Sequence, residues 1–140
     1  MPMSATVYTH DLTMALPCER LSVRTSRREL DRLLRAAGWA PLDVERALLA
    51  VTELVANAVV HARSDVVVRC RVGGHLRLEV TDTAGDAELR ARSVTPEHMD
   101  GRGLSLVETI SSRWGVERGP GMKTVWCELA QAEAGLADTG

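Results

Sequence analysis

Three polar residues recur at four-residue intervals within one apolar segment: Glu53, Asn57 and His61. In a helix, residues i, i+4 and i+8 climb the same side, so these side chains face one groove. The amide oxygen of Asn57 is a hard ligand that suits Mg²⁺ already held by phosphates and water. A carboxylate one turn earlier, at Glu53, can orient or deprotonate a nucleophile that attacks a terminal phosphate. We expect no chemical role for His61, because the negative end of a helix favours a histidine there.

Two further features suit the base and the phosphates of a nucleotide. Asp82 ends an alternating, strand-like segment, and its carboxylate can accept a hydrogen bond from an exocyclic amine such as that of adenine. Gly101 and Gly103 open an apolar-periodic segment, where missing side chains let backbone amides at a helix start approach phosphate oxygens. Each feature alone has an ordinary explanation as an exposed helix face, a turn or a loop. Together, and in this order, they predict a nucleotide pocket.

Hydrophobic periodicity predicts the helices that hold these residues. A capping box formed by Ser26 and Glu29 predicts a helix start at Ser26, and Gly38 predicts its left-handed end. A second helix is expected over residues 41–61 and a short one over residues 104–111.

Alternating and β-branched segments predict five strands. They span residues 6–16, 65–72, 75–82, 114–117 and 122–129. Gly73 and Gly74 are expected to supply positive φ values in a hairpin turn between the second strand and the third. Taken with the helices, the strands predict an α/β two-layer sandwich, in which a mixed, largely antiparallel sheet carries its helices on one face.

The length of the chain and its aperiodic segments predict the domain organisation. With 140 residues, of which 45% are hydrophobic, the chain is expected to form a single domain over residues 1–129. Residues 83–100 show no sustained period and contain Pro96, so we expect a loop that closes as a lid over bound phosphates. Residues 130–140 are expected to form a flexible tail.

Composition argues against several kinds of partner and location. The formal net charge of -2 and the aromatic content of 3% disfavour direct nucleic-acid binding. The three cysteines stand far apart without a C-x-x-C pair, so neither a disulfide framework nor a zinc site is expected. Because no stretch is apolar enough for a membrane helix and no signal-like segment opens the chain, we expect a cytoplasmic protein without membrane contact.

The first predicted helix is strongly basic. The segment from Arg24 to Arg35 holds five arginines against Glu29 and Asp31, which gives a local excess of +3. Such a segment is either a solvated helix face or a surface that docks an acidic patch of a partner protein. The planar arginine fork suits the second use, because it makes paired hydrogen bonds to carboxylates.

Several motifs in the chain resemble those of one known family. The segment Glu53-Leu54-Val55-Ala56-Asn57-Ala58-Val59-Val60-His61-Ala62 resembles the N box of the GHKL ATPase superfamily, in particular of its anti-sigma-factor serine kinases. The segment Gly101-Arg102-Gly103-Leu104 resembles the second glycine box of that family. The likeness continues through Arg113-Trp114-Gly115 and Lys123-Thr124-Val125-Trp126, which are similar to short actinobacterial ATP-binding regulators. It covers roughly residues 16–129.

This resemblance implies a role for each matching position. Asp82 binds the adenine amine, Asn57 holds the Mg²⁺ of Mg-ATP, and Glu53 is the catalytic base. Gly101, Arg102, Gly103 and Leu104 form the box that cradles the phosphates, and Thr124 matches a threonine near the adenine. The first glycine box departs from its usual D-x-G-x-G form, because Ala84 and Asp86 stand where glycines are expected. Gly85 is then the residue that replaces them, through a shift of one position.

The resemblance implies an ATP-dependent serine protein kinase that binds a sigma factor and phosphorylates a serine of an anti-sigma antagonist, and a homodimer is compatible with it. The altered first glycine box favours an alternative, a catalytically weak adaptor whose bound nucleotide switches its affinity for a partner. The retained Glu53 favours the kinase. A histidine-kinase catalytic domain is a weaker third reading, because no helix hairpin with a phosphoacceptor histidine is expected before residue 26.

Overall fold

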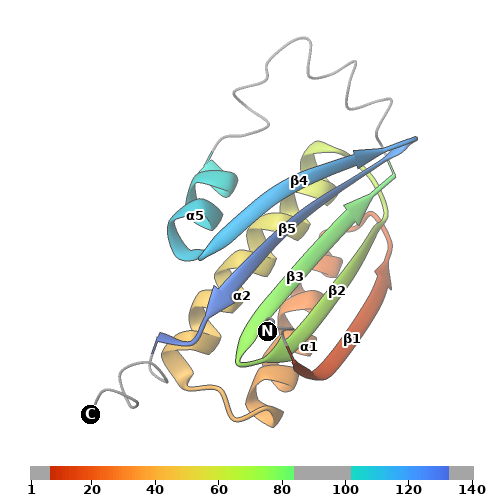
Figure 1. Ribbon diagram of the computed structural model, residues 1–140. Coiled ribbons are helices and arrows are strands. Elements are labelled where there is room, and N and C mark those ends of the chain that lie inside the picture. Colours follow the sequence, from red (N-terminus) through yellow and green to blue (C-terminus); the bar gives the residue numbers. More distant parts are fainter. Residues whose placement is uncertain (1–6, 84–101, 133–140) are drawn as a thin grey trace.

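The computed structural model describes residues 7–83 and 102–132, in which one sheet carries all the helices on one of its faces (Figure 1). The strands are β1 (Tyr8–Leu16), β2 (Val66–Gly73), β3 (His75–Asp82), β4 (Arg113–Gly119) and β5 (Met122–Ala130). The helices are α1 (Leu21–Ala36), α2 (Pro41–Ala56), the π-helical turn η1 (Asn57–His61) that continues α2, and α5 (Arg102–Ile110). The predicted two-layer α/β fold is confirmed.

The sheet has the strand order β1-β2-β3-β5-β4, and every described pair of neighbours is antiparallel, in line with the predicted largely antiparallel sheet. The chain leaves the sheet after β3, passes through α5, and returns as the β4–β5 hairpin with β5 beside β3. This order places the end of β3 between two neighbours. Asp82 lies opposite Val66 of β2 on one side and opposite Lys123 of β5 on the other.

The core lies between the sheet and the helices and is aliphatic. One cross-strand row of the sheet, Cys70, Leu78 and Cys127, is fully buried, because side chains at these register positions all point toward the helices. The helical layer contributes buried leucines from α1 and buried valines and alanines from α2. The apolar side chains that alternate along the strands therefore pack against the apolar stripes of α1 and α2 in one core.

The first helix begins earlier than the capping box predicted. α1 starts at Leu21, and Ser26 lies inside it, fully buried, with its Oγ donating to the carbonyl oxygen of Val23 at 2.8 Å. Glu29 pairs instead with Arg28 and Arg32 on the helix surface. A buried serine can satisfy its hydroxyl against the preceding helical turn, so the S-x-x-E pattern did not mark a helix end here.

The glycines of the β2–β3 hairpin serve a different purpose from the predicted one. Neither Gly73 nor Gly74 has a positive φ, whereas Gly38 after α1 does, at +81°, as predicted. A Cβ atom on Gly73 would lie within van der Waals overlap of the Val7 carbonyl oxygen, because the start of β1 passes directly over it. The hairpin therefore needs a glycine for close approach of β1 rather than for a left-handed turn.

The face of the sheet away from the helices is polar and centres on Trp126. The guanidinium carbon of Arg77 lies 4.4 Å from the centroid of the indole, and that of Arg113 lies 5.5 Å from it. Arg77 also donates to Glu79 and Glu128, both at 2.8 Å. Cation–π contacts and ion pairs therefore link the indole, two arginines and two glutamates on this face of the sheet.

The close packing of Trp126 predicts that alanine lowers stability at one glycine of β4, Gly115, and not at another, Gly119. A Cβ atom on Gly115 would lie 2.9 Å from the indole, whereas one on Gly119 would meet its nearest atom, Cγ of Met122, at 3.5 Å. We expect Gly115→Ala to lower the free energy of unfolding by about 1–3 kcal/mol through overpacking. Gly119→Ala is the control and stays within about 0.5 kcal/mol of the parent in chemical denaturation. Equal effects of the two substitutions would contradict this packing.

The three thiols predict a simple labelling pattern. Cys18 is exposed, whereas burial raises the pKa of the Cys70 and Cys127 thiols to about 12. Because the thiolate is the reactive form, iodoacetamide at pH 8 should label Cys18 in the folded protein and the two buried cysteines only after denaturation. Mass spectrometry of peptides checks this, and rapid labelling of Cys127 in the native protein would show that the core is not closed as described.

Candidate functional site

Glu53 of α2 and Asn57 and His61 of η1 form the polar line of this helical segment, and two of the three side chains are half-buried. Glu53 and Asn57 are each half-buried and lie one helical turn apart. Within residues 7–83 and 102–132, neither the Glu53 carboxylate nor the Asn57 amide forms a hydrogen bond or an ion pair. Thr52, in contrast, donates to the Leu48 carbonyl oxygen of its own helix at 2.7 Å. Two polar groups that are half-buried and unsatisfied by their neighbours suit a bound ligand.

The helix widens into a π-helical turn at Asn57 itself. The Ala62 amide donates to the Asn57 carbonyl oxygen at 3.0 Å, which is an i to i+5 bond, and His61 at the end of the turn is exposed. Arg63 then adopts a φ of +55°, a left-handed conformation that costs a non-glycine residue energy. π-Helical turns are frequent at functional sites, and this one coincides with the candidate Mg²⁺ ligand.

Ser64 ties the end of this helix to the end of β3. Its side chain is buried, with 5% of its surface exposed, and its Oγ accepts the Thr83 amide at 2.9 Å. The same Oγ lies 3.2 Å from the Thr83 Oγ and donates to the Asp65 carbonyl oxygen. The chain around Asn57 and the chain directly after Asp82 are therefore held together by one hydroxyl. Sequence reasoning missed Ser64, because it lies in a short connection with no periodic signal.

Asp82 lies on the helix-facing side of the sheet and is 2% exposed. Its Oδ2 atom lies 3.8 Å from the Nζ atom of Lys123, on the neighbouring strand β5. Thr124 lies on the other face, where its Oγ and that of Thr81 are 2.7 Å apart. The structure thus brings Lys123, and not the side chain of Thr124, to Asp82. The position of Lys123 could have been predicted from the sequence, because residues 123 and 125 lie on the same face of a strand and Val125 is apolar and buried.

The glycine box leads into α5, which packs beside α2 (Figure 1). Arg102, Gly103 and Leu104 form the first turn of this helix, whereas Gly85 and Gly101, with residues 84–100 of the expected lid, lie outside the described residues. The far end of α5 is anchored to α2, because Arg46 donates to the Ile110 carbonyl oxygen at 2.8 Å and pairs with buried Asp43 at 3.2 Å. The C-terminal end of α5 is therefore fixed relative to α2.

The donor atoms decide which ligands fit this site. Across the described part of the chain, no cluster of three or more His, Cys, Asp or Glu side chains could hold a metal ion. The amide oxygen of Asn57 therefore suits only a metal that arrives with other ligands, as Mg²⁺ does on nucleotide phosphates. A buried carboxylate at Asp82 suits an amine donor such as that of adenine. The residues present fit Mg-ATP and do not fit a protein-bound structural metal.

The junction at Ser64 predicts a stability effect. Removing the buried hydroxyl of Ser64 in Ser64→Ala takes away the acceptor of the Thr83 amide and the donor to the Asp65 carbonyl oxygen, so we expect the free energy of unfolding to fall by about 1–3 kcal/mol. Ser112→Ala is the matched control, because that exposed hydroxyl also donates to a backbone carbonyl, of Glu128, and its loss is repaired by water. Urea denaturation compares the two variants. An equal loss of unfolding free energy in the two variants would show that Ser64 does not stabilise the connection between the end of η1 and the end of β3.

Comparisons with known proteins place the chain in a family. The family model described as "Histidine kinase-like ATPase domain" matches residues 16–129. The search of curated protein sequences gave no significant match. No helix within the described residues is long and apolar enough to span a membrane.

Two solved structures share the fold. A structure of the RsbU and RsbW domains of Rv1364c from Mycobacterium tuberculosis matches 87% of this chain with 24% identity and a TM-score of 0.67, and the chain spans 32% of its length. The SiaB–SiaC complex from Pseudomonas aeruginosa matches 84% of this chain and 88% of its own, with 15% identity and a TM-score of 0.57. The family match covers most of the chain, and the chain therefore belongs to the histidine kinase-like ATPase domains.

Proposed function

We propose that this protein binds Mg-ATP between α2, α5 and the end of β3 and transfers the terminal phosphate to a serine of a partner protein. The observation that carries the proposal is a pair of polar side chains, Glu53 and Asn57, that have no polar partner among the described residues. They lie on the helical segment whose end Ser64 joins to the chain directly after the buried Asp82. Membership of an ATPase-domain family supports the same ligand.

Each residue then has a distinct task toward the nucleotide. Asp82 accepts a hydrogen bond from the adenine amine, and Asn57 offers its amide oxygen to the Mg²⁺ that accompanies the phosphates. The segment Gly101-Arg102-Gly103-Leu104 offers backbone amides to phosphate oxygens. Lys123 lies beside Asp82 and can donate to the acceptor nitrogen next to that amine. Thr124 supports this edge of the site from the opposite face of the sheet, through Thr81.

Glu53 is the candidate base. Bound ATP supplies the phosphoryl group and leaves as ADP when its terminal phosphorus–oxygen bond breaks. The Glu53 carboxylate takes the proton of the serine hydroxyl as the serine oxygen forms its new bond to phosphorus. Because no other described group pairs with this carboxylate, it is available to a substrate without first breaking an ion pair.

The protein substrate is, in this proposal, an anti-sigma antagonist, and a sigma factor is the second partner. A protein partner is supported by one of the two solved structures of like fold, which is a complex of SiaB with SiaC. The transfer and the partners together define an anti-sigma-factor-like serine kinase.

Variants of the polar line of α2 separate binding from chemistry. We expect Asn57→Ala to weaken Mg-ATP binding at least about tenfold, because a metal ligand stabilises the ground state. Glu53→Gln keeps the affinity within about threefold and lowers phosphotransfer by about 10²–10⁴-fold, because a base acts in the transition state. His61→Ala, at the exposed end of the same line, is the control and changes neither.

Calorimetry measures the affinities, and single-turnover phosphotransfer to a co-purified antagonist measures the chemistry. Unchanged Mg-ATP affinity in Asn57→Ala would contradict the metal assignment. If the parent protein binds Mg-ATP but transfers no phosphate, the alternative of a nucleotide-switched adaptor replaces the kinase.

A further inference from the structure

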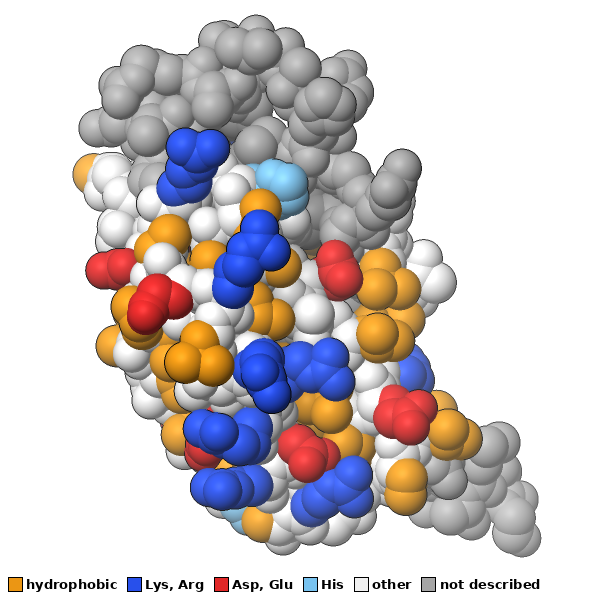
Figure 2. All heavy atoms as spheres, turned by 180° about the vertical axis from the view of Figure 1, so that it is seen from behind, with side chains coloured by type: hydrophobic (Ala, Val, Ile, Leu, Met, Phe, Trp, Pro, Cys, Tyr) orange, Lys and Arg blue, Asp and Glu red, His pale blue; other side chains and the backbone are white. Residues whose placement is uncertain are grey.

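A groove runs along the outside of the helical layer, between α1 and α2. It has a volume of ≈ 890 Å³ and is lined by four arginines, two acidic residues and four apolar side chains. Figure 2 shows basic side chains gathered with apolar ones on this helical face. None of the residues proposed to bind nucleotide lines the groove, so it is a separate feature of the surface.

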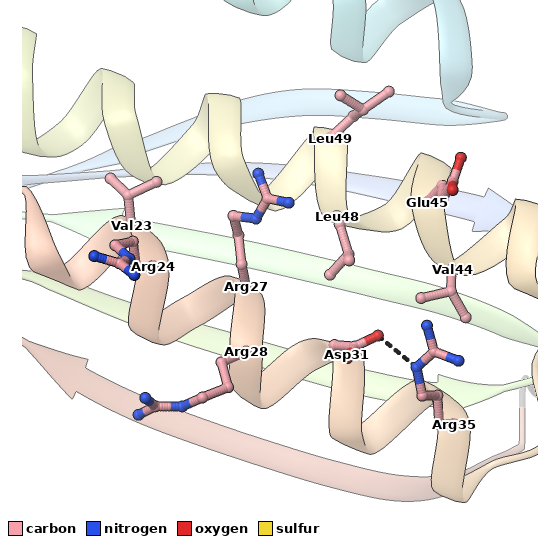
Figure 3. A pocket seen from close by; sticks show the side chains of 10 residues that line it. All are labelled: Val23, Arg24, Arg27, Arg28, Asp31, Arg35, Val44, Glu45, Leu48 and Leu49. Carbon is pink, nitrogen blue, oxygen red and sulfur yellow. Dashed lines mark hydrogen bonds and ion pairs between the residues drawn. The ribbon is translucent and has the colours of Figure 1, made fainter.

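The floor of the groove is apolar. Val44 is buried beneath it, Val23 and Leu48 are half-buried, and Leu49 of α2 is 46% exposed. Figure 3 shows Val23 on α1 and Leu48 on α2 along the groove. A partner that covers this strip removes the exposed part of Leu49 from water, which favours binding.

The walls of the groove are basic, and part of that charge is unused. Arg35 pairs with Asp31 at 2.8 Å, and Arg28 pairs with Glu29 at 3.4 Å. Arg24 and Arg27 form no ion pair with any residue in the described ranges, and Arg27 extends from α1 toward α2 (Figure 3). The groove thus presents two uncompensated guanidinium groups beside an apolar strip.

We propose that this groove binds an acidic amphipathic helix of a partner protein. The walls are two helices, and α1 has 16 residues, or about 24 Å of length, which suits a third helix laid along them. Apolar residues at positions i, i+3 and i+4 of that helix cover Leu48 and Leu49. Carboxylates beside them pair with Arg24 and Arg27, whose planar forks make two hydrogen bonds to one carboxylate.

A protein helix fits these observations better than a nucleic acid does. The apolar floor has no counterpart in a phosphate backbone, and the chain as a whole carries a net charge of -2. The proposal adds a recognition surface to the proposed function and does not depend on bound nucleotide.

The test uses a defined probe. A fluorescein-labelled 18-residue peptide carries leucines at i, i+3, i+4 and i+7 positions with glutamates between them, and a control peptide has the same composition in scrambled order. Fluorescence anisotropy, without nucleotide, measures binding to the parent protein and to two double reversals. One is Arg24→Glu with Arg27→Glu in the groove. The other is Arg20→Glu with Arg32→Glu, at exposed residues on or next to α1 that do not line the groove.

We expect the groove reversal to weaken binding of the patterned peptide by about tenfold or more and the control reversal by less than about threefold. We expect Leu49→Asn to weaken binding of the patterned peptide as well, and the scrambled peptide to bind the parent protein poorly. Circular dichroism checks folding, and Arg24→Gln with Arg27→Gln is the milder variant should the reversal unfold the protein.

Equal losses of affinity for the patterned peptide in both double reversals would overturn the proposal. Equal binding of the patterned and scrambled peptides would also overturn it, because either result would show that binding depends on charge alone. Tighter binding of a 20-base-pair DNA duplex than of the patterned peptide would make this a nucleic-acid surface instead. Calorimetry with Mg-ATP on the same preparations tests the proposed function separately, so each idea can fail without the other.

Discussion

The packing of α2 against the antiparallel sheet is the constraint on which the remaining structure depends. One face of this helix, which includes Ala47, Val51 and Val55, is fully buried against the strands, while α1 and α5 pack on either side. A helix held on three sides has little freedom to rotate or slide. The positions of Glu53 and Asn57 are therefore set by the core, and the site inherits its geometry from aliphatic packing rather than from polar contacts.

The junction after α2 transmits that constraint to β3. The π-helical turn at Asn57, the left-handed Arg63 and the buried hydroxyl of Ser64 follow one another within eight residues. Two of these features cost energy, and a residue in the left-handed region persists only where its surroundings determine it. The hydrogen bond from the Thr83 amide to the Ser64 hydroxyl holds the residue next to Arg63 in place. The same bond fixes the chain that carries Asp82 relative to the helix that carries Asn57.

The sequence predicted the elements well because their signals are periodic. Alternation marked all five strands, and the stripe of α2 was visible over its whole length. The failures have local causes. Ser26 resembled a helix cap but satisfies its hydroxyl within α1, and Gly73 is required by the approach of β1, which is distant in sequence. The N box and the second glycine box pointed to the family, because residue types at fixed spacing can be recognised in a sequence without any knowledge of local geometry.

Two features of the structure could not be predicted from the sequence alone. The groove between α1 and α2 was predicted only as a basic helix, because its apolar floor includes Leu48 and Leu49 of the other helix. The position of Lys123 beside Asp82 depends on the register of β5 against β3, which a shift of one residue would change.

The proposed function requires that the end of the α2–η1 helix and the end of β3 form one Mg-ATP site. Titration of the isotopically labelled protein with Mg-ATP, followed through amide chemical shifts, measures this. We expect saturable shifts that are largest at Asn57, Ser64, Asp82 and Thr83, with α1 little changed. Saturable shifts confined to the groove of α1 and α2, or no shifts at millimolar Mg-ATP, would contradict it.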